Sequence, residues 1–301
     1  MKRLKFYLLG LITALIVSAC GTSRTVPITG RKQTLMVSDA EVLSLSTQEY
    51  NKYMQSAKKS TNATNTAMVQ RVGQNLANAV TTYLRNNGLQ DEISQYSWEF
   101  NLVQDNNVNA FCMPGGKIVV YEGLLPVTQN EASLAIVLGH EIAHAVAKHS
   151  AEQMSKQIQQ QYGLQIGTAI AGALGMGQNT QSIAQIIAQK GLQFRNLAYS
   201  REHETEADRM GLIFAAMAGY DPNVAVNFWQ RMAASSGNNT SEFFSDHPSD
   251  ATRINNIQKH FLPEALKYYN PPKTATTATK SSTKKTTTKK TTTKKTTTKK
   301  K

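Results

Sequence analysis

The sequence predicts an α+β fold that is mostly helical and holds one small antiparallel sheet. Apolar residues recur at helical spacing along most of the chain, whereas between about residues 96 and 121 they follow the periodicity of strands. The turn Pro114-Gly115-Gly116 interrupts this second stretch and returns the chain in the opposite direction. Strands joined by so short a turn pair antiparallel, so we expect a small antiparallel sheet between helices.

The predicted elements follow one another along the chain in simple order. The first helix has a typical start at Ser38, with Asp39 in the first turn. An apolar stretch at 164–177 contains Gln165 and Thr168 and is too short to cross a bilayer, so we expect a packed helix or a mobile flap there. The predicted helices lie at about 38–58, 62–86, 130–149, 180–196, 200–218, 222–234 and 250–260, and the predicted strands at 96–103, 108–113 and 117–121.

The charge of the chain is concentrated at its two ends. A formal net charge of +13, from 33 Lys and Arg against 20 Asp and Glu, suggests a nucleic-acid-binding or membrane-surface protein. However, residues 273–301 hold 11 Lys and residues 1–19 hold three basic residues, with no acid in either segment. The part between them carries 19 basic and 20 acidic side chains. The body is therefore close to neutral, and we expect no nucleic-acid partner.

The first twenty residues are typical of an export signal. Residues 1–19 combine a basic start, an apolar run and small residues before Cys20. The run Val17-Ser18-Ala19-Cys20 resembles the bacterial lipobox, in which the cysteine is acylated and becomes the mature N-terminus. The alternative is an ordinary signal peptide that happens to contain a cysteine. Acyl chains on Cys20 would anchor the protein, followed by a polar leader at 20–37. Residues 21–23 contain no aspartate, and in this they resemble lipoproteins that are retained at the periplasmic face of the outer membrane rather than at the inner membrane.

The segment His140-Glu141-Ile142-Ala143-His144 is the most informative motif of the chain. Four residues advance a helix by about 400°, so His140 and His144 project from one face, where two imidazoles can share one Zn²⁺. Glu141 lies about 100° round the helix and can reach a water at the metal without being a ligand. The alternative is a polar helix face with two hydrogen-bonded histidines. However, the chain has only six histidines, so the H-E-x-x-H spacing would rarely arise by chance.

Two histidines leave a zinc site incomplete, because catalytic sites usually have three protein ligands. An acidic segment at 201–208 lies about 60 residues downstream on a predicted helix. Glu204 and Asp208 are one turn apart, so Glu204 can bind metal while Asp208 accepts the outer N–H of a ligand histidine. His203 and Glu206 are competing candidates. Glu206 points about 200° away from Glu204, so only one of these two carboxylates can be the ligand.

Together these motifs resemble metallopeptidase family forty-eight, which includes the CAAX prenyl proteases, the HtpX-like proteases and periplasmic lipoprotein proteases. The similarity runs from about residue 26 to 261 and rests on the H-E-x-x-H helix followed by Glu204-x-x-Ala207-Asp208. It implies a zincin-like (gluzincin) fold with an active-site helix, in a zinc metallopeptidase domain at 38–270, and it favours Glu204 as the third ligand. The chain resembles the soluble periplasmic lipoprotein branch of the family.

The resemblance implies two further parts of the site. Asn109, Ala110 and Phe111 look like the edge strand of the family, to which a substrate peptide adds as a further strand. Relatives carry a histidine near the metal at the position of His247. This histidine either occupies the open metal position in a resting state or helps to stabilise the oxyanion, and both alternatives stay open, as does a role limited to capping a helix.

The resemblance and the motifs predict a zinc-dependent endopeptidase of the bacterial cell envelope. We expect one Zn²⁺ per chain, held by His140, His144 and Glu204. Glu141 would take the proton of the attacking water and pass it to the leaving amine, with His247 as an accessory catalytic residue. The expected substrates are unfolded or misassembled envelope proteins. The alternative function is a chaperone-like protein that binds such clients and has latent or minor protease activity.

Four other features carry expectations of their own. Cys112 lies in an apolar run, so we expect a buried structural thiol rather than a nucleophile. His149 and His260 are expected at the surface. The Lys- and Thr-rich tail at 271–301 has no apolar run to bury and is predicted to be disordered. This tail is either merely solvated or binds an anionic envelope surface.

Overall fold

The computed structural model describes residues 22–160, 194, 199–235, 243, 247 and 251–271. Residues 1–21 and 272–301 and most of 161–198 and 236–250 lie outside this description. The predicted signal peptide, the lipidation of Cys20, the helix or flap at 164–177, the helix at 180–196 and the disordered tail therefore stay predictions. None of the helices in the described part is long and apolar enough to cross a membrane.

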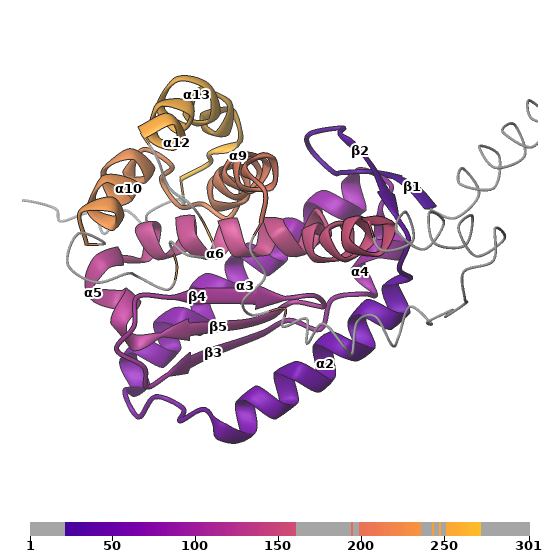
Figure 1. Cartoon of the computed structure of the whole chain (residues 1–301). Coiled ribbons are helices and arrows are strands. Elements are labelled where there is room, and N and C mark those ends of the chain that lie inside the picture. Colours follow the sequence, from indigo (N-terminus) through magenta and orange to yellow (C-terminus); the bar gives the residue numbers. More distant parts are fainter. Residues whose placement is uncertain are drawn as a thin grey trace, which may run out of the picture. The chain divides into compact units, whose positions relative to one another are not determined.

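Helices make up most of the described residues, as predicted (Figure 1). The strands are β1 (Thr22–Thr25), β2 (Lys32–Leu35), β3 (Glu99–Val103), β4 (Ala110–Met113) and β5 (Lys117–Tyr121). The helices are α2 (Asp39–Ser56), α3 (Ala63–Asn86), α4 (Gln90–Ile93), α5 (Leu125–Thr128), α6 (Glu131–Val146), α9 (Arg201–Met217), α10 (Val224–Ser235), α12 (Ala251–Asn256) and α13 (Leu262–Ala265), with a helical stretch at 149–160 and shorter turns at Glu122–Leu124, Ile257–Phe261 and Leu266–Tyr268.

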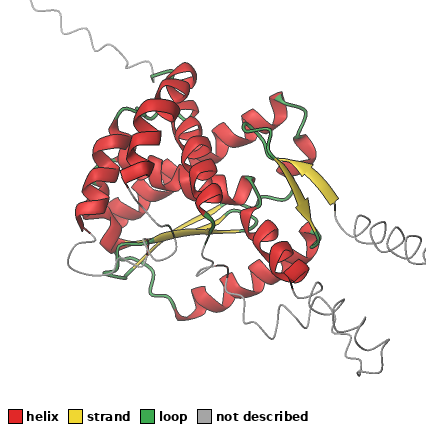
Figure 2. Ribbon diagram, turned by 45° about the horizontal axis from the view of Figure 1, so that its top comes forward, coloured by secondary structure: helices red, strands yellow, loops and turns green. Residues whose placement is uncertain are grey.

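The strands form two separate sheets, which Figure 2 shows in yellow. β1 and β2 pair as an antiparallel hairpin. The other sheet has the order β3-β5-β4, with β4 antiparallel and β3 parallel to β5. The prediction of an antiparallel sheet is thus correct for the β4–β5 hairpin and wrong for β3. The reason is that β5 lies between β3 and β4 in the sheet, although it follows both in the sequence. Periodicity does not indicate which strand of a sheet is central.

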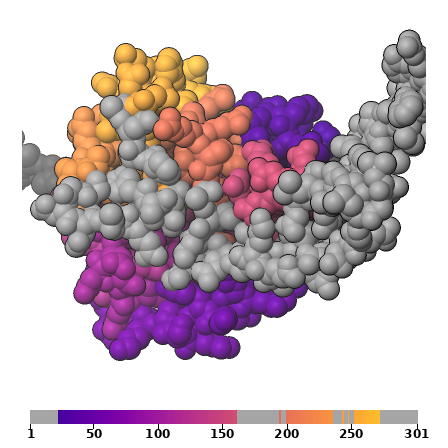
Figure 3. All heavy atoms as spheres, in the orientation of Figure 1, coloured from indigo at the N-terminus to yellow at the C-terminus, as the bar shows by residue number. Residues whose placement is uncertain are grey.

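Helix α6 is buried between the sheet and the C-terminal helices. Nearly all of its residues are inaccessible to solvent, including the polar His140, Glu141 and His144. It contacts β4 on one side and α9 on another, and it also packs against α3. Figure 3 shows α9, α10, α12 and α13 in orange to yellow on one side and α2 in indigo on the opposite side. The helix that carries the H-E-x-x-H motif therefore runs through the centre of the described fold.

Two glycines allow α6 and α9 to cross at close range. A Cβ atom on Gly139 would lie 2.5 Å from the carbonyl oxygen of Gly211, and a Cβ atom on Gly211 would lie 2.5 Å from the backbone nitrogen of His140. Both distances are shorter than any tolerable contact, so either helix would have to move if a methyl group were added there. The crossing point is adjacent to His140 and two helical turns from Glu204, so it sets how close the two predicted ligand helices approach.

We therefore expect Gly211→Ala to push α9 away from α6. The added methyl group overpacks the crossing and should lower the free energy of unfolding by about 1–3 kcal/mol. Chemical denaturation measures this change, and metal content after dialysis measures the accompanying displacement of the ligands. The control is Thr205→Ala on the exposed face of α9. Wild-type stability and metal content in Gly211→Ala would contradict the inferred contact.

Candidate metal centre

The two histidines of the motif lie side by side on α6. The helix begins at the Asn130 cap, whose side chain accepts a hydrogen bond from the backbone of Ser133, and it continues unbroken past both histidines. His140 and His144 are each 1% exposed, and their Nε2 atoms lie 3.1 Å apart. Two imidazole nitrogens at this distance repel each other when both present lone pairs, so a proton or a cation must lie between them.

Helix α9 brings a carboxylate to the same point. The Oε2 atom of Glu204 lies 3.3 Å from Nε2 of His140, and its Oε1 atom lies 3.3 Å from Nε2 of His144. One turn further on, Asp208 places Oδ1 3.0 Å from the other ring nitrogen of His140. This is the arrangement expected from the spacing of the two acids.

The carboxylate of Asp208 is itself held in place. Arg253, from α12, donates a hydrogen bond from one guanidinium nitrogen to Oδ1 of Asp208 at 2.6 Å. The guanidinium group stacks on the indole of Trp229, 3.7 Å from the ring centroid. Because the stacked arginine is buried, its direction is fixed, and so is the oxygen that faces His140.

His247 completes the group. Its Nδ1 atom lies 3.2 Å from Nε2 of His140 and 3.0 Å from Oε1 of Glu204. Four buried side chains each offer one metal-binding atom, and these four atoms lie within 4.8 Å of one another. The side chains are those of His140, His144, Glu204 and His247. The three ligands predicted from the sequence and the predicted accessory histidine are thus close enough to bind one metal ion together.

Glu141 lies beside this group but does not belong to it. Its carboxylate approaches the group at His247, with Oε1 3.5 Å from Nε2. The backbone of Cys112 in β4 donates a hydrogen bond to the carboxylate, whereas Oε1 is buried with no hydrogen-bond partner among the described residues. Burial raises the pKa of Glu141, although His247 and His140 oppose the shift. A buried oxygen that lacks a partner can accept a proton from a water or a substrate.

The charges in the group depend strongly on one another. Burial opposes ionisation of Glu204, but the three neighbouring histidines outweigh it and hold the pKa of this carboxyl well below its usual range. Burial also lowers the pKa of His140, yet Glu204 and Asp208 more than compensate and raise it to about 9. Burial lowers the pKa of His144 well below its ordinary value. The group therefore combines an ionised carboxylate with histidines, which is the donor chemistry that first-row divalent metals prefer.

Strand β4 lies at an edge of its sheet. β4 occupies one end of the strand order and contacts α6. Ala110 and Phe111 belong to β4, and Asn109 precedes it and accepts a hydrogen bond from the backbone of Tyr121. The thiol of Cys112 is buried, as predicted.

The competing candidates in the acidic segment lie elsewhere. Glu206 and His203 are both buried but are not part of the four-residue group. Glu206 accepts a hydrogen bond from Nε2 of His149 at 3.0 Å, in the tautomer that donates there. His203 stacks on the ring of His149 with centroids 4.4 Å apart. Of the two glutamates, Glu204 thus contacts the histidines of α6, whereas Glu206 contacts His149.

The expected surface position of His149 is wrong, whereas His260 is exposed as predicted. His149 is 0% exposed, and burial lowers its pKa to about 4. The predicted helix at 130–149 in fact ends at Val146, and Lys148 adopts a left-handed φ of 54° before helical structure resumes at residue 149. His149 therefore starts a new helix and lies against His144. No periodicity in the sequence predicts a single left-handed lysine.

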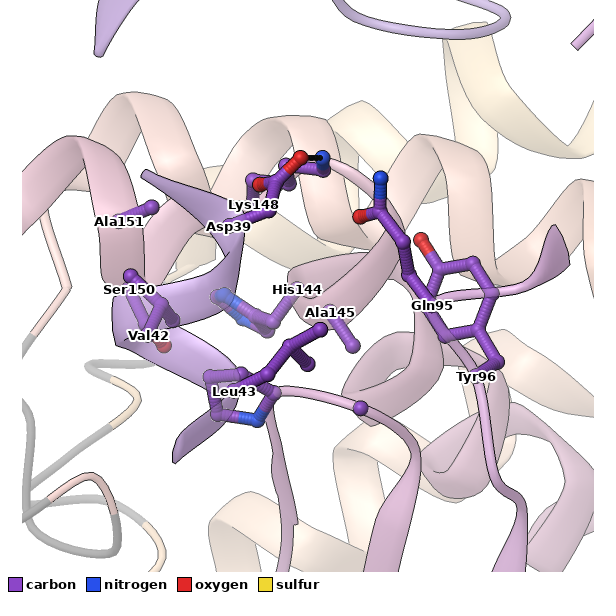
Figure 4. Close-up of a pocket in the computed structure, with 12 residues that line it drawn as sticks. Asp39, Val42, Leu43, Gln95, Tyr96, His144, Ala145, Lys148, Ser150 and Ala151 are labelled. Carbon is purple, nitrogen blue, oxygen red and sulfur yellow. Dashed lines mark hydrogen bonds and ion pairs between the residues drawn. The ribbon is translucent and has the colours of Figure 1, made fainter. Parts of the chain in front are cut away.

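The left-handed turn is held by ion pairs. Nζ of Lys148 lies 2.5 Å from Asp39 and 3.1 Å from Glu92. Figure 4 shows the pair of Lys148 and Asp39 beside a small pocket, of about 30 Å³, to which His144 and Tyr96 also contribute. Two carboxylates from other elements thus fix the lysine side chain and offset the cost of its backbone conformation.

Comparison with known proteins agrees with this geometry. The model of Peptidase family M48 matches residues 63–260. The chain is 39% identical over 175 residues to the mitochondrial metalloendopeptidase OMA1 of Schizosaccharomyces pombe, covering 58% of this chain and 49% of that protein. It is 30% identical over 246 residues to the mitochondrial metalloendopeptidase OMA1 of Homo sapiens, covering 80% and 46%.

A bacterial relative is also similar. The chain is 30% identical over 168 residues to the beta-barrel assembly-enhancing protease of Yersinia pestis, covering 54% of this chain and 34% of that protein. The chain thus spans about half the length, or less, of these relatives.

Proposed function

The chain belongs to Peptidase family M48, and from this premise we propose that it is a zinc-dependent endopeptidase of the bacterial cell envelope. The observation that carries the proposal is the buried group of two histidines from α6, one glutamate from α9 and His247. Relatives named as metalloendopeptidases support the reaction type. The relative named as a beta-barrel assembly-enhancing protease supports the envelope.

Zinc fits the distances in the group. Zinc binds histidine nitrogens and carboxylate oxygens at about 2.0–2.2 Å in tetrahedral geometry, which places neighbouring ligand atoms about 3.3 Å apart. Nε2 of His140 lies 3.1 Å from Nε2 of His144 and 3.3 Å from Oε2 of Glu204, and Nε2 of His144 lies 3.3 Å from Oε1 of the same carboxylate. These three side chains would hold the metal, and Asp208 would orient His140 from outside.

Each residue of the site has a role that follows from its position. When bound, zinc supplies Lewis-acid chemistry for the attack of water on a peptide carbonyl. Glu141 keeps one buried oxygen without a partner among the described residues, so it can take a proton from the attacking water and later give it to the leaving amine. A raised pKa suits this exchange, because it brings the carboxyl closer to the pH at which it works. β4 would hold the substrate as an added strand beside Glu141, along Asn109, Ala110 and Phe111.

Glu141→Gln tests the assignment of the base. The amide cannot take a proton, so we expect cleavage of an unfolded protein to fall about 10²- to 10⁴-fold while zinc content stays at one per chain. The matched control is Glu131→Gln at the exposed start of the same helix, which should cleave like the wild type. Equal activity of Glu141→Gln and wild type would contradict the role of Glu141.

For His247 we propose a resting position on the metal. Its Nδ1 atom is as close to His140 and Glu204 as these are to each other, so it would fill the fourth corner of the zinc site. A substrate or inhibitor would have to displace it.

His247→Ala separates this resting role from oxyanion stabilisation. Removal of a competing ligand should tighten the binding of a peptide hydroxamate, which occupies the open position of zinc, whereas removal of a hydrogen-bond donor would weaken it. The dissociation constant can be measured by calorimetry, with His260→Ala as the exposed control. Unchanged or weaker binding by His247→Ala would contradict the resting position.

The proposed location rests on the N-terminal sequence. The lipobox-like run before Cys20 would place a lipid anchor there, at the periplasmic face of the outer membrane, with unfolded or misassembled envelope proteins as substrates. The 11 lysines of the tail would add attraction to an anionic envelope surface.

Cys20→Ser tests the anchor. Without the thiol no thioether can form, so the variant should leave the membrane fraction of expressing cells, and its mass should lack the acyl groups of the wild type. Cys112→Ser is the control, because this cysteine is buried in β4. A Cys20→Ser protein that stays in the membrane fraction would contradict lipid attachment at Cys20.

A further inference from the structure

The two histidines of α6 differ in the partner of their Nδ1 atom, the ring nitrogen on the side away from Glu204. Nδ1 of His140 meets a carboxylate directly, that of Asp208. Nδ1 of His144 meets a second imidazole instead, with His149 Nδ1 at 2.9 Å. The other ring nitrogen of His149 lies 3.0 Å from Glu206. The carboxylate that serves His144 is therefore one imidazole further away.

This chain of contacts fixes where the protons lie. If Nε2 of His144 faces the metal, its proton is on Nδ1 and is donated to His149. Nδ1 of His149 must then present its lone pair, so its own proton lies on Nε2 and is donated to Glu206. Both rings are neutral and each has a single permitted tautomer. A lone pair at His149 and a negative charge at Glu206 are both needed to hold His144 in this state.

Glu206 is held by the β1–β2 hairpin. Nε of Arg31 lies 2.8 Å from Oε2, and Thr29 donates a hydrogen bond to Oε1 at 2.5 Å. The same arginine pairs with Glu152, on the helix that His149 begins. The hairpin is more than 100 residues from His144 in the sequence, yet only His149 and Glu206 separate Arg31 from His144.

From these contacts we propose that His149 is a positioning residue for the metal ligand His144, and that Arg31 of the β1–β2 hairpin sets the metal affinity of the site through Glu206. The proposal rests on the proposed zinc site. It assigns to His149 no contact with substrate or metal. The β1–β2 hairpin then belongs to the residues that hold the metal ligands in place. Replacing such a residue typically changes metal affinity by about 10- to 100-fold.

The test compares two replacements of His149. His149→Phe keeps a ring but removes the acceptor, so we expect about 10- to 100-fold weaker Zn²⁺ binding in competition with a chelator. His149→Gln offers an amide oxygen to His144 and an amide N–H to Glu206, so its affinity should return to within about threefold of the wild type. Co²⁺-loaded proteins should show the same order in their visible absorption, with His149→Phe altered and His149→Gln like the wild type.

The hairpin is tested with two basic residues that differ in their partner. Arg31→Met removes the support of Glu206 and should weaken Zn²⁺ binding by about three- to tenfold, a smaller loss than at His149 because the residue is two contacts from the ligand. Lys32→Met is the control: it lies in the same hairpin, and its Nζ donates a hydrogen bond to Thr25 rather than to Glu206. Its Zn²⁺ affinity should equal that of the wild type.

The outcomes separate this proposal from the proposed function. Asp208→Asn serves as the reference for a lost outer partner. If the wild type binds no Zn²⁺, both proposals are overturned. If Asp208→Asn weakens binding while His149→Phe and Arg31→Met do not, the role of His149 alone is overturned. The role of His149 is also overturned if His149→Phe and His149→Gln lose the same Zn²⁺ affinity and the same stability in the metal-free state. Should His149→Phe not fold, the difference between Arg31→Met and Lys32→Met decides.

Discussion

The close crossing of α6 and α9 is the constraint on which the candidate metal centre depends. Gly139 and Gly211 let the two backbones touch where a Cβ atom would collide. This contact sets the separation between His140 on one helix and Glu204 on the other, and zinc ligands tolerate only small errors in position. Other elements of the described fold pack on these two helices: α3 and β4 pack on α6, α13 packs on α9, and α10 packs on α6.

The side chains around the ligands extend this dependence to distant parts of the chain. His140 is oriented by Asp208, whose carboxylate is bonded to an arginine of the C-terminal helices. His144 is oriented by His149, whose partner Glu206 is bonded to the N-terminal hairpin. The two ends of the described body thus meet at the proposed metal ligands through separate chains of hydrogen bonds. Metal binding and the folding of the described body should therefore be coupled, since ligands held by both ends come together only when both ends are in place.

Sequence reasoning could predict the parts of the site that depend on local spacing. The H-E-x-x-H motif needs only a continuous helix, and the opposite directions of Glu204 and Glu206 follow from their spacing on one helix. The choice of Glu204 as the ligand comes from the family resemblance. Sequence reasoning could not predict what depends on a single backbone angle or on tertiary order. The left-handed conformation of Lys148 ends α6 early and turns His149 from an expected surface residue into a buried neighbour of the site. The central position of β5 depends likewise on packing, and no period of the sequence encodes it.

X-ray absorption spectroscopy at the zinc edge of the metal-loaded wild-type protein tests the central claim most directly, because it reports the ligands of the ion itself. The account predicts four nitrogen and oxygen ligands at about 2.0–2.1 Å, with the multiple scattering of three imidazoles, from His140, His144 and His247. A sulfur ligand would contradict it, since Cys112 is buried in β4 outside the metal group. A six-coordinate shell of oxygen atoms with no imidazole scattering would contradict it as well.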